Sequence, residues 1–312
     1  MMQQHSIPTP YMVGEVHFYT AESDDGAWIF DCGPPLKEGR DALEKTVDFE
    51  RLRHVFLTHC HIDHYGLAPW LEGRSGATIW LSGLDLAKLV RREEHEAKTA
   101  ELLHSLGFGP AFMESMRESF RRTTVTPVDF SRYRTVENTE PPAGLGWLAC
   151  PGHSQGDLVW LSGDEAVSGD VILRGIFQVP LLDLDLSAFE GRFRNYEAWC
   201  DSIPKLGSLR GKRILPGHRE TVDIDSALVD YATTLFQRAA LVKRHRRLPV
   251  PDIVDEIFRG RLIDPFFVYL KASEIVFMLD FLDDPKRLER SFSAVGLMDR
   301  VAEPYFDAIS DS

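Results

Sequence analysis

The sequence predicts a layered fold in which α-helices pack against β-strands. Strand-like and helix-like runs alternate between residues 16 and 81, an order typical of stacked helix and sheet layers. Apolar residues at helical spacing fill residues 84–122, between two strand-rich regions. Residues 252–312 then have the pattern of a helical tail. We therefore expect a strand-rich core with a helical insertion and a helical extension at the C-terminal end.

Individual elements follow from the spacing of apolar residues. Short apolar runs bounded by Gly, Pro or polar residues are typical of strands. On this basis we expect strands at 16–20, 27–30, 55–57, 78–81, 147–150, 158–161 and 212–215. Helices are indicated where apolar residues recur every three or four positions. We expect them at 40–51, from 67 onward, at 196–206, and along a longer stretch that includes 228–242.

The helical insertion, residues 84–122, reads as a helix that ends at Gly107 and a second helix around Met116. Its Met and Phe residues fit either core packing or a cap over a substrate pocket. Pro249, Val250 and Pro251 break the pattern after the basic run 243–247. We place a domain boundary there, with residues 1–248 as the main domain and 249–312 as a C-terminal helical extension. This extension is too apolar to be exposed, so we expect it to pack on the main domain, beside the pocket, or in a homodimer interface.

Composition limits the classes of function. The 312 residues carry a net charge of −13, which makes nucleic acid an unlikely main partner because a polyanion would be repelled. Four cysteines show no C-x-x-C pair, so we expect free thiols in a reducing cytoplasm. The N-terminus lacks the features of a secretory signal, and the longest apolar stretch is interrupted by Asp280. The sequence therefore predicts a cytoplasmic protein without a membrane span.

A dense cluster of metal-ligand residues follows the strand expected at 55–57. The segment Thr58–Gly66 contains His59, His61, Asp63 and His64. Imidazole and carboxylate groups are good ligands for divalent metals. His59 and His61 are two residues apart, so on an extended loop they can point to the same side, while Cys60 points away. Four ligands at one strand end indicate two metals, because one ion would still need an open position for water.

Three later segments share one arrangement: a strand, a small residue and then a ligand-type residue. They are Pro151-Gly152-His153, Ser168-Gly169-Asp170 and Pro216-Gly217-His218. Glycine before the ligand lets the backbone turn sharply and approach a metal closely. Taken together and in this order, the three segments indicate further ligands of the same centre.

This combination resembles the metallo-β-lactamase superfamily, and specifically its glyoxalase II-like hydrolases with two metals, over about residues 12–220. The resemblance implies an α+β fold, a four-layer αββα sandwich with the site on loops along one edge of the sheets. It assigns His59, His61 and His153 to the first metal and Asp63, His64 and His218 to the second. Asp170 would bridge both. Asp31, at the end of an early strand, would support the ligands from outside.

The implied reaction is hydrolysis by a hydroxide shared between two cations, which lower the pKa of the bridging water. Asp63 or Asp170 could orient the hydroxide and carry a proton. We expect a small-molecule substrate with an ester-like bond, most simply a thioester or an ester. Glutathione itself is not expected, because no Gly-Cys-Gly-Arg segment is present. Zinc is the expected metal; iron and manganese suit the same ligands.

Other functions share the same ligand set. Superfamily lactonases place a tyrosine near the metals, and Tyr196 is the first tyrosine after Asp170. A superfamily endoribonuclease would need a basic surface, for which residues 243–247 with Arg192 and Arg194 are the candidates. An iron-dependent redox enzyme and a ligand-binding or interaction protein remain the alternatives of another class.

Overall fold

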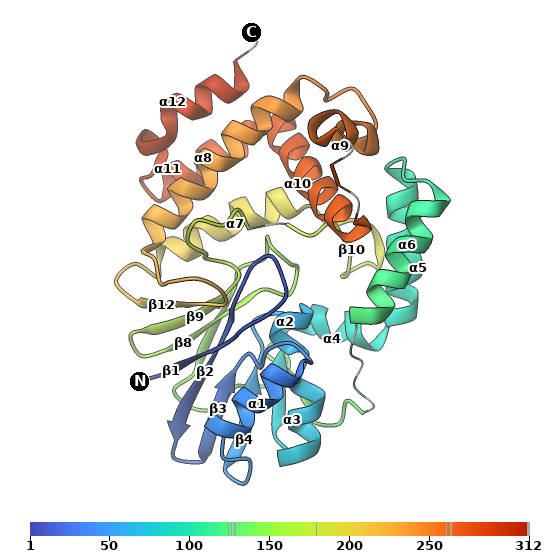
Figure 1. Cartoon of the computed structure of the whole chain (residues 1–312). Helices are drawn as coiled ribbons and strands as arrows, with labels where there is room; N and C mark the ends of the chain where they lie inside the picture. The colour runs from blue at the N-terminus through green and yellow to red at the C-terminus, as the bar shows by residue number, and fades with distance from the viewer. Residues whose placement is uncertain are drawn as a thin grey trace.

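Two β-sheets stack face to face, and helices cover the outer face of each (Figure 1). The structure is a computed structural model that describes residues 1–310 except 124, 126, 128, 179, 260 and 263, with the backbone alone for residues 120–123. The first sheet has the order β1-β2-β3-β4-β5-β6, with β1 Gln3–Ile7, β2 Val16–Ser23, β3 Gly26–Phe30, β4 Leu52–Phe56, β5 Thr78–Leu81 and β6 Tyr133–Thr135. The second has the order β12-β9-β8-β7, with β7 Gly146–Ala149, β8 Leu158–Ser162, β9 Glu165–Gly169 and β12 Arg213–Pro216. The predicted four-layer αββα fold is confirmed.

Aromatic side chains fill the space between the two sheets. Phe56 of the first sheet lies 5.0 Å, between ring centroids, from both Phe30 and Trp160. Trp160 comes from β8 of the second sheet, and its Nε1 donates to the carbonyl of Leu57 at 2.9 Å. Because β4 runs straight into the ligand segment, this packing fixes the strand end from which the site begins.

Helices on the outer faces complete the layers. α1 (Lys37–Thr46) and α3 (Ala68–Ser75) bury Leu43 and Leu71 in the core that faces the first sheet. α7 (Asn195–Gly207) and α8 (Ile224–Lys243) belong to the core that includes Val159 and Ile214 of the second sheet. Each helix thus buries its apolar side against a sheet, as its spacing predicts.

The segment expected to form the helical insertion contains three helices, α4 (Gly83–Val90), α5 (Arg92–Ser105) and α6 (Pro110–Thr123). The first helix expected there is broken at Arg91, which lies between α4 and α5 with non-helical dihedral angles. The predicted end at Gly107 agrees with its positive φ of 102°, a conformation that favours glycine. Leu103 and Met116 are buried in the same core as the C-terminal helices, and α6 packs on α10.

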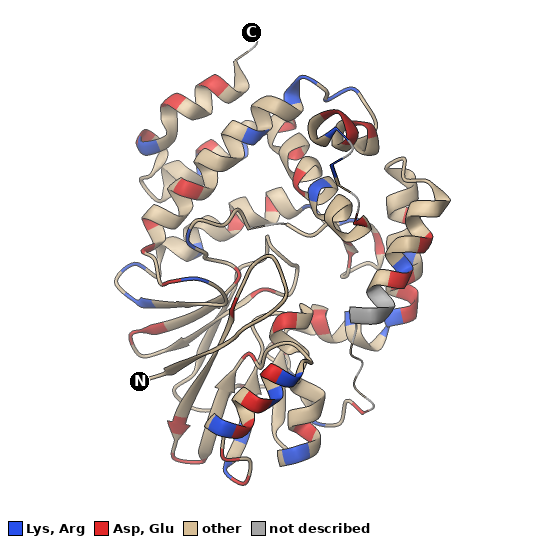
Figure 2. Cartoon of the chain, in the orientation of Figure 1, with Lys and Arg blue, Asp and Glu red and all other residues tan. Residues whose placement is uncertain are grey.

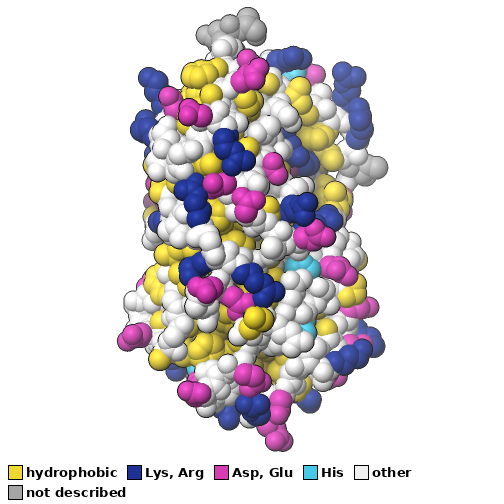
Figure 3. All heavy atoms as spheres, turned by 90° about the vertical axis from the view of Figure 1, so that its left-hand side faces the viewer, with side chains coloured by type: hydrophobic (Ala, Val, Ile, Leu, Met, Phe, Trp, Pro, Cys, Tyr) yellow, Lys and Arg dark blue, Asp and Glu magenta, His cyan; other side chains and the backbone are white. Residues whose placement is uncertain are grey.

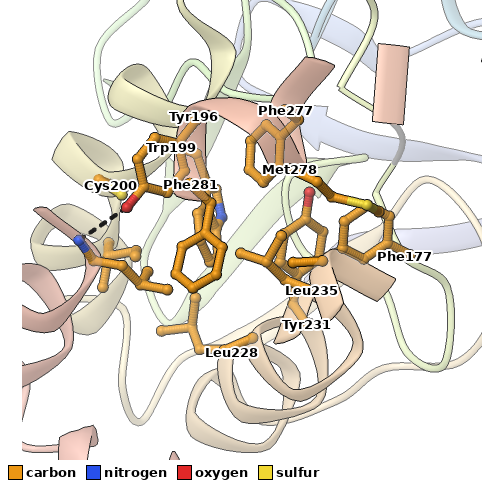
Figure 4. Close-up of a cluster of buried hydrophobic side chains, with 14 of the residues drawn as sticks. Phe177, Tyr196, Trp199, Cys200, Leu228, Tyr231, Leu235, Phe277, Met278 and Phe281 are labelled. Atoms are coloured by element: carbon orange, nitrogen blue, oxygen red, sulfur yellow. Dashed lines mark hydrogen bonds between the residues drawn. The ribbon is translucent and has the colours of Figure 1, made fainter. Parts of the chain in front are cut away.

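The C-terminal helices are α9 (Val250–Phe258), α10 (Pro265–Asp283), α11 (Pro285–Ala294) and α12 (Met298–Ile309). α10 contacts α6, α7, α8 and α9, which explains why it is apolar on nearly every side. Phe277, Met278 and Phe281 of α10 pack against Tyr231 and other residues of α7 and α8 (Figure 4). Most apolar residues of the tail are therefore buried or half-buried within this chain, while Phe306 is exposed.

Two strands of the first sheet lie outside the predicted set. β1 contains Gln3, Gln4 and His5, and it forms the sheet edge through antiparallel pairing with β2. Edge strands have one unpaired side and need little apolar alternation. β6 has only three residues, too few for a periodic pattern. Among the described residues, no helix is both long enough and apolar enough to cross a membrane.

Candidate metal centre

The candidate ligands lie on loops that follow strand ends at one edge of the sandwich. Residues 57–61 connect β4 to the short helix α2 (Ile62–Tyr65). Asp170 follows β9 directly, and His218 follows β12 by two residues. β9 and β12 are parallel neighbours, with Gly169 paired to Pro216. Because parallel neighbours end at the same edge, Asp170 and His218 emerge side by side.

Three histidines form the first group. His59 Nε2 lies 2.9 Å from His61 Nδ1, and His153 Nε2 lies 2.9 Å from the same His61 atom. One nitrogen of each ring falls within 4.8 Å of the others. Zinc–nitrogen bonds of about 2.0–2.1 Å place two ligands of one ion roughly 3 Å apart. The first group therefore has the spacing of ligands around one cation.

Asp63, His64 and His218 form the second group, within the same 4.8 Å limit. His218 Nε2 lies 3.3 Å from Asp63 Oδ2. Asp170 stands between the groups: its Oδ1 is 3.4 Å from His64 Nε2 and 3.6 Å from His218 Nε2, while its Oδ2 is 3.6 Å from His153 Nε2. The structure thus brings together all seven residues that the sequence suggested as ligands.

Residues outside the two groups orient the rings. His64 donates from Nδ1 to Asp31 Oδ2 at 2.8 Å, and His218 donates from Nδ1 to the carbonyl of Glu15 at 2.7 Å. His59 Nδ1 lies 3.1 Å from Thr58 Oγ1, which itself donates to Asp31 at 2.8 Å. Fixing Nδ1 in this way leaves Nε2 of each ring as the atom that faces the centre, as in protein metal sites.

The buried atoms at the centre fit a cation. Among the described residues, His64 Nε2, His218 Nε2 and Asp170 Oδ1 are buried and have no hydrogen-bond partner. Buried polar atoms in native structures are almost always satisfied by protein, water or an ion. A divalent ion between these nitrogens and carboxylates would satisfy them, and the donor set is one that zinc, iron and manganese accept. The residues present therefore fit a metal centre.

Ionisation differs between the two groups. Burial lowers the pKa of His59 and His61 well below the usual value, and neighbouring imidazoles lower it further. Burial acts in the same sense on His64, but the carboxylates of Asp170, Asp63 and Asp31 outweigh it and raise the His64 pKa well above the usual value. Burial would raise the pKa of Asp63, yet the charges of His64 and His218 lower it to about 2. The carboxylates of the second group thus favour a positive charge at the position where a cation would bind.

Two glycines allow the close packing of these loops. A Cβ on Gly217 would lie 2.5 Å from both Asp170 Oδ1 and His64 Cε1, so no larger residue fits there. Gly169 has a φ of 50°, and a Cβ on it would lie 2.3 Å from Thr58 Oγ1. The role that the sequence suggested for glycine, close approach of the backbone, therefore applies at both positions.

Some contacts around the centre were missed by sequence reasoning. Asp85, in the first turn of α4, faces Cys60, so Cys60 does point away from the metal-ligand atoms toward a helix. Gln178 donates from its side chain to the carbonyl of Asp170. The only signal for Asp85 was a Ser82-x-x-Asp85 capping pattern, which indicates a helix start and says nothing of its neighbours. Tyr196 is fully buried in the helical core (Figure 4). Its hydroxyl donates to the Asp284 carbonyl.

Known structures share this fold. A metallo-beta-lactamase family protein from Thermus thermophilus, TTHA1429, aligns over 91% of this chain and 94% of its own, with a TM-score of 0.70 and 20% identity. A beta-lactamase domain protein from Burkholderia ambifaria aligns over 90% of this chain and 86% of its own, also with a TM-score of 0.70 and 20% identity. At this level of identity the likeness shows the fold alone.

Residues 12–218 match the sequence profile of the metallo-beta-lactamase superfamily, and the chain belongs to this superfamily. Its members are largely metal-dependent hydrolases, and the His/Asp cluster of this chain fits such a metal site. Ribonuclease Z of Streptococcus pyogenes is 43% identical over 49 residues, which are 15% of this chain and 15% of that protein. This chain therefore spans only a small part of the length of that relative.

Proposed function

We propose that the protein is a two-metal hydrolase of the glyoxalase II-like type and that it cleaves an ester-like bond, with a thioester or an ester as the preferred substrate. One observation carries this proposal. Two groups of three ligand residues face the same carboxylate, Asp170, from opposite sides, with its Oδ1 toward His64 and His218 and its Oδ2 toward His153. A carboxylate in this position suits a bridge between two cations.

In this proposal His59, His61 and His153 hold one ion, and Asp63, His64 and His218 hold the other. Zinc is our first choice, with iron or manganese as alternatives. When bound, the ions would lower the pKa of water and polarise an oxygen of the substrate.

Asp63 and Asp170 would carry the proton chemistry of this site. Asp63 is the less buried of the two, and its Oδ2 faces His218 Nε2 at 3.3 Å. Its greater exposure would let it exchange a proton with the attacking water, the substrate or solvent. Asp170 is 7% exposed, and the Gln178 side chain holds its backbone carbonyl. That contact would fix the backbone from which the carboxylate of Asp170 projects between the two groups.

We further propose that residues 1–248 form the catalytic domain and that residues 249–312 help to build its substrate pocket. The backbone N–H of Leu181 donates to the carbonyl of His153 at 3.1 Å. The backbone of the next residue, Leu182, makes two hydrogen bonds to α10. Its N–H donates to Ser273 Oγ at 3.0 Å, and its carbonyl accepts from the hydroxyl of Tyr269 at 2.5 Å. The C-terminal extension thus supports a segment that touches a ligand loop, which favours a pocket walled by helices.

A ribonuclease is the second candidate, favoured by the short stretch of similarity to ribonuclease Z. The charged surface argues against it. Of the basic residues nominated for RNA binding, Arg192 and Arg194 pair with Asp280 at 2.7 and 3.0 Å, and Arg246 pairs with Asp283 at 2.9 Å. Basic and acidic residues alternate along the ribbon in Figure 2, and their side chains are interspersed over the face shown in Figure 3. RNA binding would need a continuous basic surface.

The position of Tyr196 argues against a lactonase, because Tyr196 was the candidate for the tyrosine that superfamily lactonases place near the metals. Its hydroxyl is engaged by the Asp284 carbonyl and by the Leu288 N–H, within the helical core. A lactone therefore ranks below an open-chain thioester or ester. The lactone still belongs in the test, because the ligand set would serve both reactions.

A substrate panel on the purified full chain tests the proposal. Metal content is measured first, and the protein is then assayed with one thioester, one ester, one lactone and one phosphodiester. We expect about two metal ions per chain and turnover of the thioester or the ester. Turnover of the phosphodiester alone would favour the ribonuclease. Full metal occupancy with no turnover of any substrate would favour a redox enzyme or a binding protein.

A further inference from the structure

Asp85 occupies a position between two of the ligand loops although it belongs to neither. It lies in the first turn of α4, where its backbone N–H donates to Ser82 Oγ at 3.1 Å. Its side chain is 3% exposed. The proposed reaction makes no use of this buried carboxylate, so its location calls for another role.

One side of the Asp85 carboxylate lies directly on the loop that follows His153. A Cβ on Gly156 would lie 2.3 Å from Asp85 Cγ and Oδ2 and 2.5 Å from Oδ1. No Cβ is tolerated at such distances, so the carboxylate rests on the bare backbone of Gly156. The preceding residue, Gln155, binds the carbonyl of Leu184 at 2.7 Å and the N–H of Leu186 at 2.9 Å. The loop against Asp85 is therefore also held by residues 184–186.

The Asp85 carboxylate also faces the first ligand loop. It lies against the thiol and the backbone N–H of Cys60, the residue between His59 and His61. The charge of Lys88 and, more weakly, these two Cys60 groups lower the pKa of Asp85. Burial is stronger and raises that pKa to about 6. Among the described residues, Asp85 Oδ2 has no hydrogen-bond partner. A carboxylate buried at this cost and not fully satisfied needs a compensating function.

Residues of α4 and α5 also bind a third segment. Lys88, one turn after Asp85, donates to Asp183 Oδ2 at 2.7 Å, and His95 Nε2 lies 2.6 Å from Asp183 Oδ1. Asp183 lies on the chain between Asp170 and β10 (Leu184–Asp185). Lys88 is hydrogen-bonded to Asp183, and its charge also acts on Asp85. The Asp85 carboxylate itself lies against Cys60 and Gly156.

We propose that Asp85 is a positioning residue, which sets the spacing between the His59–His61 turn and the His153 turn by lying between Cys60 and Gly156. The inference rests on the proposed metal centre, because those two turns supply the ligands of its first ion. It also gives the helices of residues 83–123 a role in building the centre, in addition to any role as a cap.

A double-mutant cycle tests this contact. Gly156→Ala, Asp85→Ala and the double variant are made in the full chain, and Co²⁺ affinity and the Co²⁺ absorption spectrum are measured, since both report on ligand geometry. We expect each single variant to bind Co²⁺ about 10- to 100-fold more weakly. In the double variant the new Cβ occupies the space of the lost carboxylate, so affinity should be no lower than for Asp85→Ala. Additive losses, or wild-type affinity for Asp85→Ala, would overturn the proposal.

Two control variants and one conservative variant separate positioning from general destabilisation. A Cβ on Gly73 would meet nothing within 4 Å, and Asp225 is a first-turn acid of α8, so Gly73→Ala and Asp225→Ala should leave the Co²⁺ spectrum unchanged. Asp85→Asn keeps the number of heavy atoms and removes the charge; we expect it to weaken Co²⁺ binding about 10-fold while thermal stability is kept. Unchanged Co²⁺ binding by this variant would contradict the proposal, even if Gly156→Ala failed to fold.

These readouts are independent of substrate. Tight Co²⁺ binding by the wild type without turnover of any substrate would count against the proposed function. The double-mutant cycle would still decide the Asp85 proposal in that case. If the wild type turns over substrate but the Asp85 variants bind Co²⁺ as tightly as the wild type does, the result would count against the positioning role alone.

Discussion

The imidazole of His64 donates from Nδ1 to Asp31 Oδ2 at 2.8 Å, and both side chains are buried. Asp31 also accepts from the backbone N–H and the hydroxyl of Thr58, each at 2.8 Å. One carboxylate thus holds a residue of the first ligand turn and a ring of the second group. The relative placement of the two groups depends on Asp31 for this reason.

Replacing Asp31 with alanine should weaken the metal centre and the fold together. His64 would lose the acceptor that orients it, so metal affinity should fall about 10- to 100-fold. Buried donors on Thr58 and His64 would also be left unpaired, which costs about 1–3 kcal/mol each. Metal titration and thermal unfolding check both effects. Asp24→Ala, at an exposed turn, serves as the control, and equal behaviour of the two variants would contradict the prediction.

Removing one ligand from either part of the centre should abolish hydrolysis. His61→Ala removes the nitrogen that faces both His59 and His153, and Asp170→Ala removes the carboxylate shared by the two groups. We expect His61→Ala to lose one metal ion and Asp170→Ala to bind both weakly. Elemental analysis and the substrate assay measure this. Variants that keep full metal content and full activity would show that the ligand assignment is wrong.

Metal affinity should rise with pH, because a cation must displace protons from the second group. The pKa values of His64 and His218 are raised by the carboxylates around them, against the effect of burial. In the metal-free protein, the stability contributed by protonated His64 is fully present below its unfolded pKa near 6.5 and is lost as pH rises through the raised folded value. Metal binding reverses this preference, since it requires neutral imidazole.

Calorimetry at two pH values measures this effect. We expect proton release on Zn²⁺ binding and tighter binding at about pH 8 than at about pH 6. His59 and His61, whose pKa values are lowered by burial, should add little to the release. Affinity that does not change with pH would mean that the second group takes no part in binding.

Tyr231→Phe should loosen the segment that follows Asp170. The Tyr231 hydroxyl donates to the backbone carbonyl of Gln178 at 2.7 Å, and the Gln178 side chain donates to the carbonyl of Asp170. Loss of the hydroxyl leaves a buried acceptor unpaired, at a cost of about 1–3 kcal/mol in unfolding free energy. Chemical denaturation measures the loss. Tyr305→Phe, whose hydroxyl makes a longer contact of 3.3 Å to Glu289, should cost less; the opposite order would contradict this reading.

Local patterns in the sequence predicted most strands and helices and led to the candidate ligands. Strand ends followed by Gly152-His153, Gly169-Asp170 and Gly217-His218 are contiguous features, and the structure places all three at one edge. β1 and β6 escaped prediction because one is a polar edge strand and the other is only three residues long. Periodicity carries no information on such elements.

The sequence by itself indicated the alternation of strands and helices and the candidate metal ligands, because both depend on patterns within short segments, and its resemblance to a known superfamily supplied the order of the layers. Tertiary structure alone decided that Tyr196 is buried away from the centre, that Arg192 is paired with Asp280, and that Asp85 lies against Gly156. These relationships join residues far apart in the chain. They arise only when side chains of separate elements pack together, and no periodicity within one segment encodes which distant partner each will meet.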